Sequence, residues 1–150
     1  MMMRYLILFA CLGSILLLAS MIPKENMTNT KDKNVLGGEL QLCCNSPKTG
    51  FYRDGFCSTG YEDYGVHVVC AEVTEDFLSY TKAQGNDLST PLPPPSSFPG
   101  LKPGDKWCLC ASRWKQAYDA GHAPKVVLES THQKALDFVP LSILKENAAE

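Results

Sequence analysis

Cysteine and histidine side chains dominate the chemistry that this sequence could carry out. The chain has seven cysteines and three histidines among its 150 residues. Thiolates and imidazoles are the ligands that zinc prefers in proteins, so a zinc site is one interpretation of the pattern. The candidate metal ligands are Cys57, His67, Cys70, Cys108, Cys110 and His132.

The expected strands determine which of these ligands can share a site. Side chains alternate between the two faces of a strand. Cys108 and Cys110 should therefore point to one face, whereas His67 and Cys70 point to opposite faces of a regular strand. His67 and Cys70 can share a site only if their strand bulges. The alternative is that Cys70 and Cys108 are buried core side chains, as free cysteines often are.

Thiol catalysis is a second interpretation. Cys110 is predicted at the junction between a strand and a helix, with Arg113 close by. A helix N-terminus and a nearby cation both favour the thiolate, which is the reactive form of cysteine. A histidine would then act as the base, and a carboxylate would orient it. The catalytic candidates are Cys110, Cys57 and His132, with His67 as the alternative base and Asp63 or Asp87 as the orienting group. A packed, inert cysteine is again the alternative.

Polar residues near the expected loops favour a third interpretation, which is a ligand pocket. Arg53 or Arg113 would bind a small anionic ligand through the guanidinium group. Asp54 and Asp87 also suit a structural role, because aspartates hold turns and loops through bonds to nearby backbone. The candidate ligand-binding residues are Arg53, Asp54, Asp63, His67, Asp87, Arg113 and Trp114.

The oxidation state of the cysteines depends on the hydrophobic N-terminal segment. Residues 5–22 carry no charge and form a run long enough to span a bilayer. We interpret residues 1–23 first as a membrane anchor, with a cleaved signal or a translation start at Met21 or Met27 as alternatives. The flanking positive charges favour a cytoplasmic domain, and a chain without this leader would be cytoplasmic too. The six cysteines outside the leader would form disulfides after export, but would be thiols or metal ligands in a reducing compartment.

The length and net charge of the chain limit the remaining classes of function. The chain fits one domain, which we expect at residues 34–150 after a polar linker at 24–33. The formal net charge is −2, and no cluster of lysine and arginine interrupts this balance. Nucleic-acid binding is therefore not expected, because it requires a basic surface.

The order of expected elements predicts a compact two-layer α+β domain with a small sheet and two main helices. Helix caps, proline and glycine positions, and runs of β-branched residues define the elements. They are a tight hairpin at 51–56, a strand at 66–73, a helix from Thr74 to Gly85, a proline-rich loop at 88–104, a strand at 106–110, a helix at 111–120, a strand at 126–130 and a helix at 141–146.

Several specific stretches occur in one order along the chain: NVLGG (34–38), TGFYRDG (49–55), GNDLSTP (85–91), FPGLKPGD (98–105) and WCLCASRW (107–114). Together they resemble a bacterial-type family catalogued as domain of unknown function 2237. The resemblance extends from residue 34 to residue 146 and implies a compact α+β domain, usually without a leader and with no established activity. The chain departs from the family at Phe56-Cys57, where relatives often have two adjacent cysteines.

The sequence leaves the function unassigned, and three classes stay open. The first is a small binding or accessory domain with a polar pocket and several cysteines. The second is a thiol-dependent or metal-assisted enzyme, which requires a cysteine within hydrogen-bond reach of a histidine in a cleft. The third is a structural or interaction module, which predicts scattered buried cysteines and no polar cleft.

Overall fold

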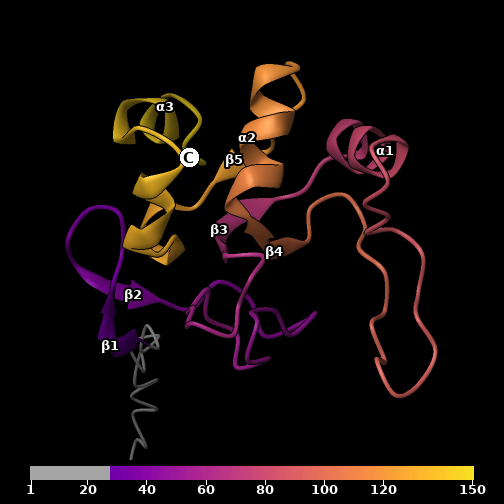
Figure 1. Ribbon diagram of the computed structural model, residues 1–150, viewed down its shortest axis with the longest axis horizontal. Coiled ribbons are helices and arrows are strands. Elements are labelled where there is room, and N and C mark those ends of the chain that lie inside the picture. The colour runs from indigo at the N-terminus through magenta and orange to yellow at the C-terminus, as the bar shows by residue number, and fades with distance from the viewer. Residues whose placement is uncertain (1–27) are drawn as a thin grey trace, which may run out of the picture.

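The domain is a mixed α+β fold, as the sequence predicted. The computed structural model describes residues 28–150, which form two small antiparallel sheets and three α-helices (Figure 1). Two 3₁₀ turns, at Leu128–Ser130 and Gln133–Asp137, precede the last helix. The elements are β1 (Thr28–Lys33), β2 (Glu39–Gln41), β3 (His67–Glu72), α1 (Glu75–Ala83), β4 (Lys106–Cys110), α2 (Ala111–Asp119), β5 (Lys125–Val126) and α3 (Leu141–Glu146).

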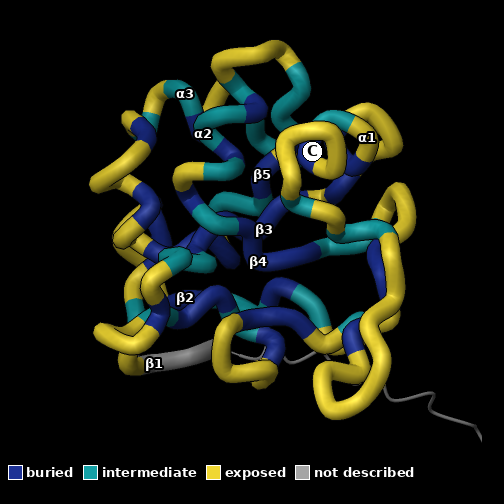
Figure 2. The backbone as a smooth tube through the Cα atoms, turned by 45° about the vertical axis from the view of Figure 1, so that its right-hand side comes forward, coloured by how far each residue is buried: buried dark blue, intermediate teal, exposed yellow. Residues whose placement is uncertain are grey.

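The larger sheet has β3 at its centre, with β4 on one side and β5 on the other. Residues 68–71 of β3 are fully buried, so this strand is covered on both faces. The three helices lie on one side of this sheet. The segment that contains β1, β2 and the loop before β3 lies on the other side (Figure 1, Figure 2).

Local signals explain both main helices. Thr74 caps α1 by accepting a hydrogen bond from the Phe77 amide, and Glu75 and Asp76 occupy its first turn, where carboxylates favour the positive end of the helix. In α2, the residues at positions 111, 114 and 117 form the buried stripe. Trp114 is fully buried in the core between the helices and the sheet.

Two disulfides join the sheet to the layer on its other face. Cys43 is bonded to Cys70 on β3, and Cys57 is bonded to Cys108 on β4. Cys70 and Cys108 are direct cross-strand partners, so the two bridges lie next to each other. Among residues 28–150 the structure thus shows disulfides for four cysteines, and leaves Cys44 and Cys110 free.

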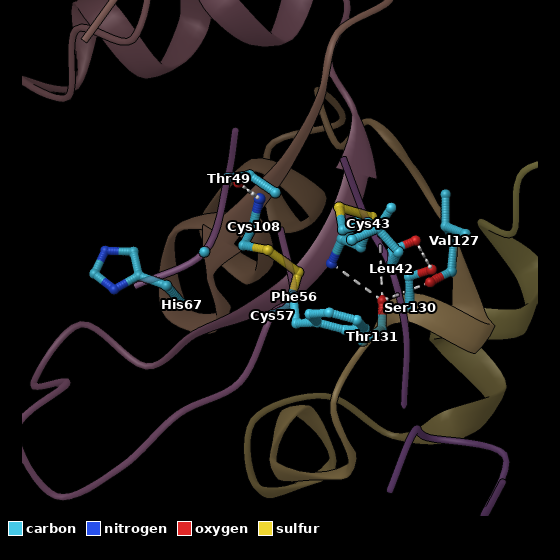
Figure 3. Close-up of a disulfide and its surroundings, with 12 residues drawn as sticks. Leu42, Cys43, Thr49, Phe56, Cys57, His67, Cys108, Val127, Ser130 and Thr131 are labelled. Carbon is cyan, nitrogen blue, oxygen red and sulfur yellow. Dashed lines mark hydrogen bonds between the residues drawn. A yellow bond between two sulfur atoms is a disulfide. The ribbon is translucent and has the colours of Figure 1, made fainter. Parts of the chain in front are cut away.

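Two buried threonines hold the strands beside the disulfides (Figure 3). The Thr49 hydroxyl accepts a 2.8 Å hydrogen bond from the Cys108 amide. The Thr131 hydroxyl accepts one of 3.1 Å from the Cys70 amide and donates one of 2.8 Å to the Val127 carbonyl. These bonds replace water for buried polar groups, which would otherwise destabilise the fold.

Three expected elements differ from the structure. The hairpin expected at 51–56 is wrong: this segment is a series of turns, because its Gly55 carbonyl accepts hydrogen bonds from the Cys43 and Cys44 amides instead of from a neighbouring strand. The strand expected at 126–130 ends at Val126 and continues as a 3₁₀ turn. The expected linker ends earlier than residue 33, because residues 28–33 form β1, which pairs with β2.

The expected leader at 1–23, with its membrane anchor at residues 5–22, lies outside the described residues. Within residues 28–150, no helix has the length and apolar character that a membrane span requires.

Replacing Thr131 by valine should destabilise the domain by about 1–3 kcal/mol, because the Cys70 amide and the Val127 carbonyl would lose a buried partner. Urea unfolding followed by circular dichroism measures the change. Thr131→Ser is the matched control, since it retains the hydroxyl and should cost less. Equal stability of the valine and wild-type proteins would contradict the role given to this hydroxyl.

Candidate active site

His67 and Cys110 face each other at the end of the β3–β4 ladder. Their Cα atoms are register partners, and the next pair along is Val69 with Leu109. Two steps along β3 therefore correspond to one step along β4, which is a β-bulge. Because cross-strand partners share a face, the bulge brings His67 to the same face as Cys108 and Cys110. A regular strand would have pointed His67 away from the face that carries Cys70.

The backbone before His67 is held in a left-handed conformation. Val66 has φ of 47°, which a β-branched residue rarely adopts. Its N–H donates to the Asp63 carbonyl, and its own carbonyl accepts from the Ala111 amide, both at 3.0 Å. These bonds tie the segment that carries His67 to the first residue of α2, next to Cys110. Such strain persists where the surroundings fix the conformation, and it is common at functional sites.

Asp63 is the buried partner of His67. Its side chain is fully shielded from solvent, and its Oδ1 lies 2.5 Å from Nδ1 of His67. Oδ2 accepts hydrogen bonds from the His67 amide at 2.8 Å and from the Thr59 hydroxyl at 3.0 Å. The carboxylate is therefore well hydrogen-bonded, as a buried charge requires. Because Asp63 engages Nδ1, Nε2 is the ring nitrogen of His67 that remains for other partners.

Electrostatics favour the protonated form of His67. The pKa of His67 rises from 6.5 to about 9, first because of its hydrogen bond with Cys110 and then because of Asp63, against the lowering effect of burial. Burial by itself would raise the pKa of Asp63, but hydrogen bonds from the backbone and ring of His67 outweigh it and lower that pKa. The result is an ion pair between Asp63 and His67 at the side of Cys110.

Two further residues fix the position of the imidazole ring. Phe51 stacks on His67, with ring centroids 6.2 Å apart and planes inclined by 17°. Gly65 lies beneath the ring, and a Cβ atom at this position would overlap it. The sequence analysis missed both residues. The signal available for Gly65 was a glycine between the aspartate and the histidine; for Phe51 we find no signal.

His67 and Cys110 line an open pocket of about 360 Å³. The loop between β2 and β3, the segment after α1, the proline-rich loop and β4 all contribute to its wall. Ligand binding in this pocket stays a prediction. The other lining residues include Gly50, Phe51, Arg53, Asn86, Asp87, Leu88, Leu92, Ser96, Phe98, Trp107, Cys108 and Leu109.

Arg53 supplies positive charge to the pocket. Its guanidinium carbon lies 5.1 Å from the centroid of the Trp107 ring, which is a favourable cation–π distance. Its Nη1 donates a 2.7 Å hydrogen bond to the Gly50 carbonyl. A guanidinium has five N–H donors in a rigid fork, and the bond to Gly50 uses one of them. Arg53 can therefore bind an anionic group while its position is held by Trp107.

The proline-rich loop forms the rim of the pocket and is fixed at both ends. At its start, Asp87 accepts hydrogen bonds from the Ser89 and Thr90 amides, and lies 3.1 Å from the Lys82 ammonium group. The Thr90 hydroxyl is the main reason that the pKa of Asp87 is lowered. Near its end, the loop buries the Phe98 ring against the pocket wall. Residues 91–97 between these points are exposed.

The catalytic candidate His132 lies elsewhere. It does not line the pocket, and its Nδ1 caps a 3₁₀ turn by accepting from the Lys134 amide at 3.0 Å. Its own amide donates to the Val68 carbonyl. Burial is the main cause that lowers the pKa of His132. The structure therefore brings Cys110 together with His67, the alternative base, and gives His132 a structural environment.

Four of the candidate ligand-binding residues also lie outside the pocket lining, namely Asp54, Asp63, Arg113 and Trp114. Arg113 is bonded to the Gln84 carbonyl and the Gln116 side chain. Trp114 is fully buried, which leaves no surface for a ligand. Asp54 accepts the amide of the residue two positions on, which is the turn role that we considered as its alternative.

The candidate metal ligands divide in a similar way. Cys57, Cys70 and Cys108 are bonded in disulfides, so they are not thiolates in this structure. The sulfurs of Cys57 and Cys108 do converge with that of Cys43, all within 4.8 Å of one another. Three cysteines thus lie where a reduced chain could hold a metal, and Cys43 was missing from the predicted set. Zinc binding stays a prediction.

A family model covers almost all of the described chain. It matches residues 33–148 and represents a family described as uncharacterised proteins conserved in bacteria, the domain of unknown function 2237. The chain belongs to this family. The match confirms the resemblance seen in the sequence, and it includes every residue of the pocket. A search of curated proteins found no match. The function of this member of domain of unknown function 2237 must therefore be argued from its geometry.

The raised pKa of His67 can be measured directly. We expect the imidazole to titrate at about 9 in the wild type, as followed by ¹H–¹⁵N NMR of the ring. Cys110→Ser and Asp63→Asn should each shift the value toward 6.5, because each removes a partner of the imidazolium. The associated stability should be complete below about pH 6.5 and should disappear as the pH rises through about 9. A wild-type value near 6.5 would refute the ion pair.

Gly65→Ala tests the position of the ring independently. The added methyl group would displace the imidazole from Asp63 and Cys110, because it overlaps the ring atoms. The expected result is a His67 pKa closer to 6.5, with the fold retained, since the displaced group is an outward side chain. Ring NMR gives the pKa and urea unfolding gives the stability. An unchanged His67 pKa in a folded variant would show that Gly65 does not position the ring.

Proposed function

We propose that the domain is a cysteine-dependent enzyme in which Cys110 attacks a small anionic substrate. The observation that carries this proposal is the juxtaposition of a half-exposed free cysteine, a histidine bonded to a buried aspartate, and an open pocket. Nucleophilic cysteines are activated by this kind of neighbour. The register pairing of Cys110 with His67 supports the enzyme class of the sequence analysis, which requires a cysteine close to a histidine in a cleft.

Each of the three residues has a distinct role. Cys110 is the nucleophile, and its sulfur forms a bond to the electrophilic atom of the substrate. His67 is the counter-ion of the thiolate, and it donates the Nε2 proton to the leaving group when the bond to that group breaks. Asp63 is a positioning residue, because its bonds to the Nδ1 atom and the amide of His67 fix the tautomer and the ring orientation.

The surroundings of Cys110 support the same role. Cys110 is the N-cap residue of the nine-residue helix α2. The positive end of the helix dipole therefore lies at this residue, where it favours a negative charge. The first amides of a helix also lack intrahelical partners. The Ala111 amide donates to the Val66 carbonyl, so the amides of the next two residues are the donors that would stabilise negative charge as it develops on the substrate.

The pocket supports a small substrate with one negative group and an apolar part. The lining includes the guanidinium group of Arg53, whose fork suits a carboxylate. The aromatic rings of Phe51, Phe98 and Trp107 supply apolar wall. A cavity of this volume lies near the lower end of the range for small-molecule sites.

The two other functional classes make different predictions. A structural module would have scattered cysteines and no polar cleft, whereas four cysteines of the described chain pair closely and a polar pocket lies beside them. A binding domain would use the same pocket, but its Cys110 thiol would have no reason to react faster than an ordinary thiol.

Alkylation by iodoacetamide separates an enzyme from a binding domain. Cys110 and Cys44 are both partly exposed and free, so Cys44 is a matched internal control. We expect Cys110 to react on the order of tenfold faster than Cys44 at pH 7, because its neighbours favour the thiolate. Peptide mapping by mass spectrometry assigns the modified residue. His67→Gln should remove the difference, whereas Cys44→Ser should leave the Cys110 rate unchanged.

Equal rates at the two cysteines would contradict the proposal. So would a Cys110 rate that His67→Gln leaves unchanged in a folded variant. A slow Cys110 together with tight binding of a small carboxylate in the pocket would favour the binding domain instead.

A further inference from the structure

Four buried cysteines form a cluster of their own between the sheet and the layer on its other face. The members of this sulfur cluster are Cys43, Cys57, Cys70 and Cys108, and none is more than 7% exposed. The sulfurs of Cys43, Cys57 and Cys108 all lie within 4.8 Å of one another. Cys70 is bonded to Cys43, so its sulfur adjoins this group (Figure 3). Four sulfurs therefore converge in one buried volume.

The β3–β4 ladder brings the two strand cysteines of the sulfur cluster close together. Cys70 and Cys108 are register partners. Each amide has a single N–H, which donates to a threonine hydroxyl, that of Thr131 or Thr49. The two cysteines therefore form a non-hydrogen-bonded pair, the kind in which side chains lie closest. Backbone pairing, and not only the disulfides, holds these two sulfurs side by side.

The sulfur cluster is a main link between the sheet and the layer that contains β2 and the loop before β3. Both disulfides cross this boundary. The apolar surroundings of the cluster are small: within residues 28–150, the hydrophobic residue packed against it is Val127, and the main core is a separate cluster. Reduction would remove the covalent link and leave little apolar packing in its place. Small structures with a limited core depend on disulfides or a metal for stability, so a reduced chain needs another link here.

We propose that, in the reduced chain, the four cysteines of the sulfur cluster bind one zinc ion as thiolates, and that zinc then replaces the two disulfides as the link between the layers. Structural zinc sites are tetrahedral and often have four cysteine ligands, at about 2.3 Å. This geometry separates the sulfurs by about 3.8 Å, so sulfurs that already lie within 4.8 Å need only small side-chain movements. The site is distinct from the candidate active site and does not depend on the role of Cys110.

The exchange of disulfides for zinc is balanced with a dithiol as the reductant. Two dithiol molecules reduce the two protein disulfides to four thiols and are themselves oxidised to disulfides. Zinc then binds the four sulfurs and displaces their protons. In reverse, two molecules of a small disulfide oxidise the four thiolates and are reduced to four thiolates of their own. The protein disulfides form again, and zinc is released.

The pocket is the route to this site. Cys108 belongs both to the sulfur cluster and to the pocket lining, and a buried metal site requires an entry path of this kind. The exchange keeps the two layers joined in either redox environment: through disulfides where the compartment is oxidising, and through zinc where it is reducing.

Elemental analysis of the full chain tests the proposal. One sample keeps its disulfides and the other is reduced with a water-soluble phosphine; both are equilibrated with Zn²⁺ and desalted. We expect about one zinc ion per reduced chain and none on the oxidised chain, because disulfide sulfurs are not thiolate ligands. The reduced, zinc-loaded chain should also unfold at a higher urea concentration than the same chain in a chelator.

Substitutions locate the ligands. In the reduced chain, Cys57→Ser should weaken zinc affinity on the order of tenfold or more. Cys44→Ser and Cys110→Ser are the matched controls and should retain the wild-type affinity. Co²⁺ in place of zinc counts the thiolates through its sulfur-to-metal charge-transfer absorption. This absorption should fall by about a quarter in Cys70→Ser, which keeps three of the four ligands.

A reduced wild-type chain that stays folded and binds no zinc would overturn this inference, and that measurement needs no variant. Loss of zinc in Cys110→Ser would also overturn it, because the metal would then lie in the pocket. Equal zinc on the oxidised and reduced chains would do the same. Rapid alkylation of Cys110 in a chain that binds no zinc would leave the proposed nucleophile standing, whereas zinc binding with a slow Cys110 would refute only the nucleophile.

Discussion

The antiparallel pairing of β3 with β4 is the constraint on which the rest of the structure depends. On one face of this pair, apolar residues support the helices and the main core. On the other face, the partners Cys70 and Cys108 anchor the two disulfides, and the next pair at the same face is His67 with Cys110. One ladder of backbone hydrogen bonds thus sets the core, the covalent bridges and the candidate site. A register shift of one residue would disrupt all three, because it reverses the facing of every side chain.

The electrostatics of the site depend on how water is kept from one carboxylate. Asp63 is fully shielded, and its hydrogen bonds come from Thr59 and from His67 itself. A buried charge is tolerated only where such partners replace its hydration. The imidazole ring of His67 is partly exposed at the pocket, whereas the Asp63 carboxylate is not. The protonated form of His67 is therefore stabilised in part by a group that does not line the pocket.

Local signals predicted much of the fold, whereas the site depended on a feature without a local signal. The predictions of Thr74 as a helix cap and of a strand at 106–110 were correct. Both depend on signals that act within a few residues, namely a side-chain oxygen that caps a helix and a run of β-branched or aromatic residues that favours a strand. The prediction of a hairpin at 51–56 was wrong. The segment does form turns, but its backbone hydrogen-bond partners lie in a different segment of the chain. The facing of His67 could not be derived by alternation, because the left-handed backbone at Val66 precedes a bulge. Disulfide partners likewise depend on tertiary contacts.

The proline-rich loop has a consequence for how this family can diversify. The hydrogen bonds of Asp87 fix the start of the loop, and the buried Phe98 ring fixes the part near its end. Residues 91–97 between them are exposed to solvent. Adding or removing residues in such a stretch changes the closure entropy of the loop only slightly. Insertions and deletions there can therefore widen or narrow the mouth of the pocket, while the residues at its base keep their positions.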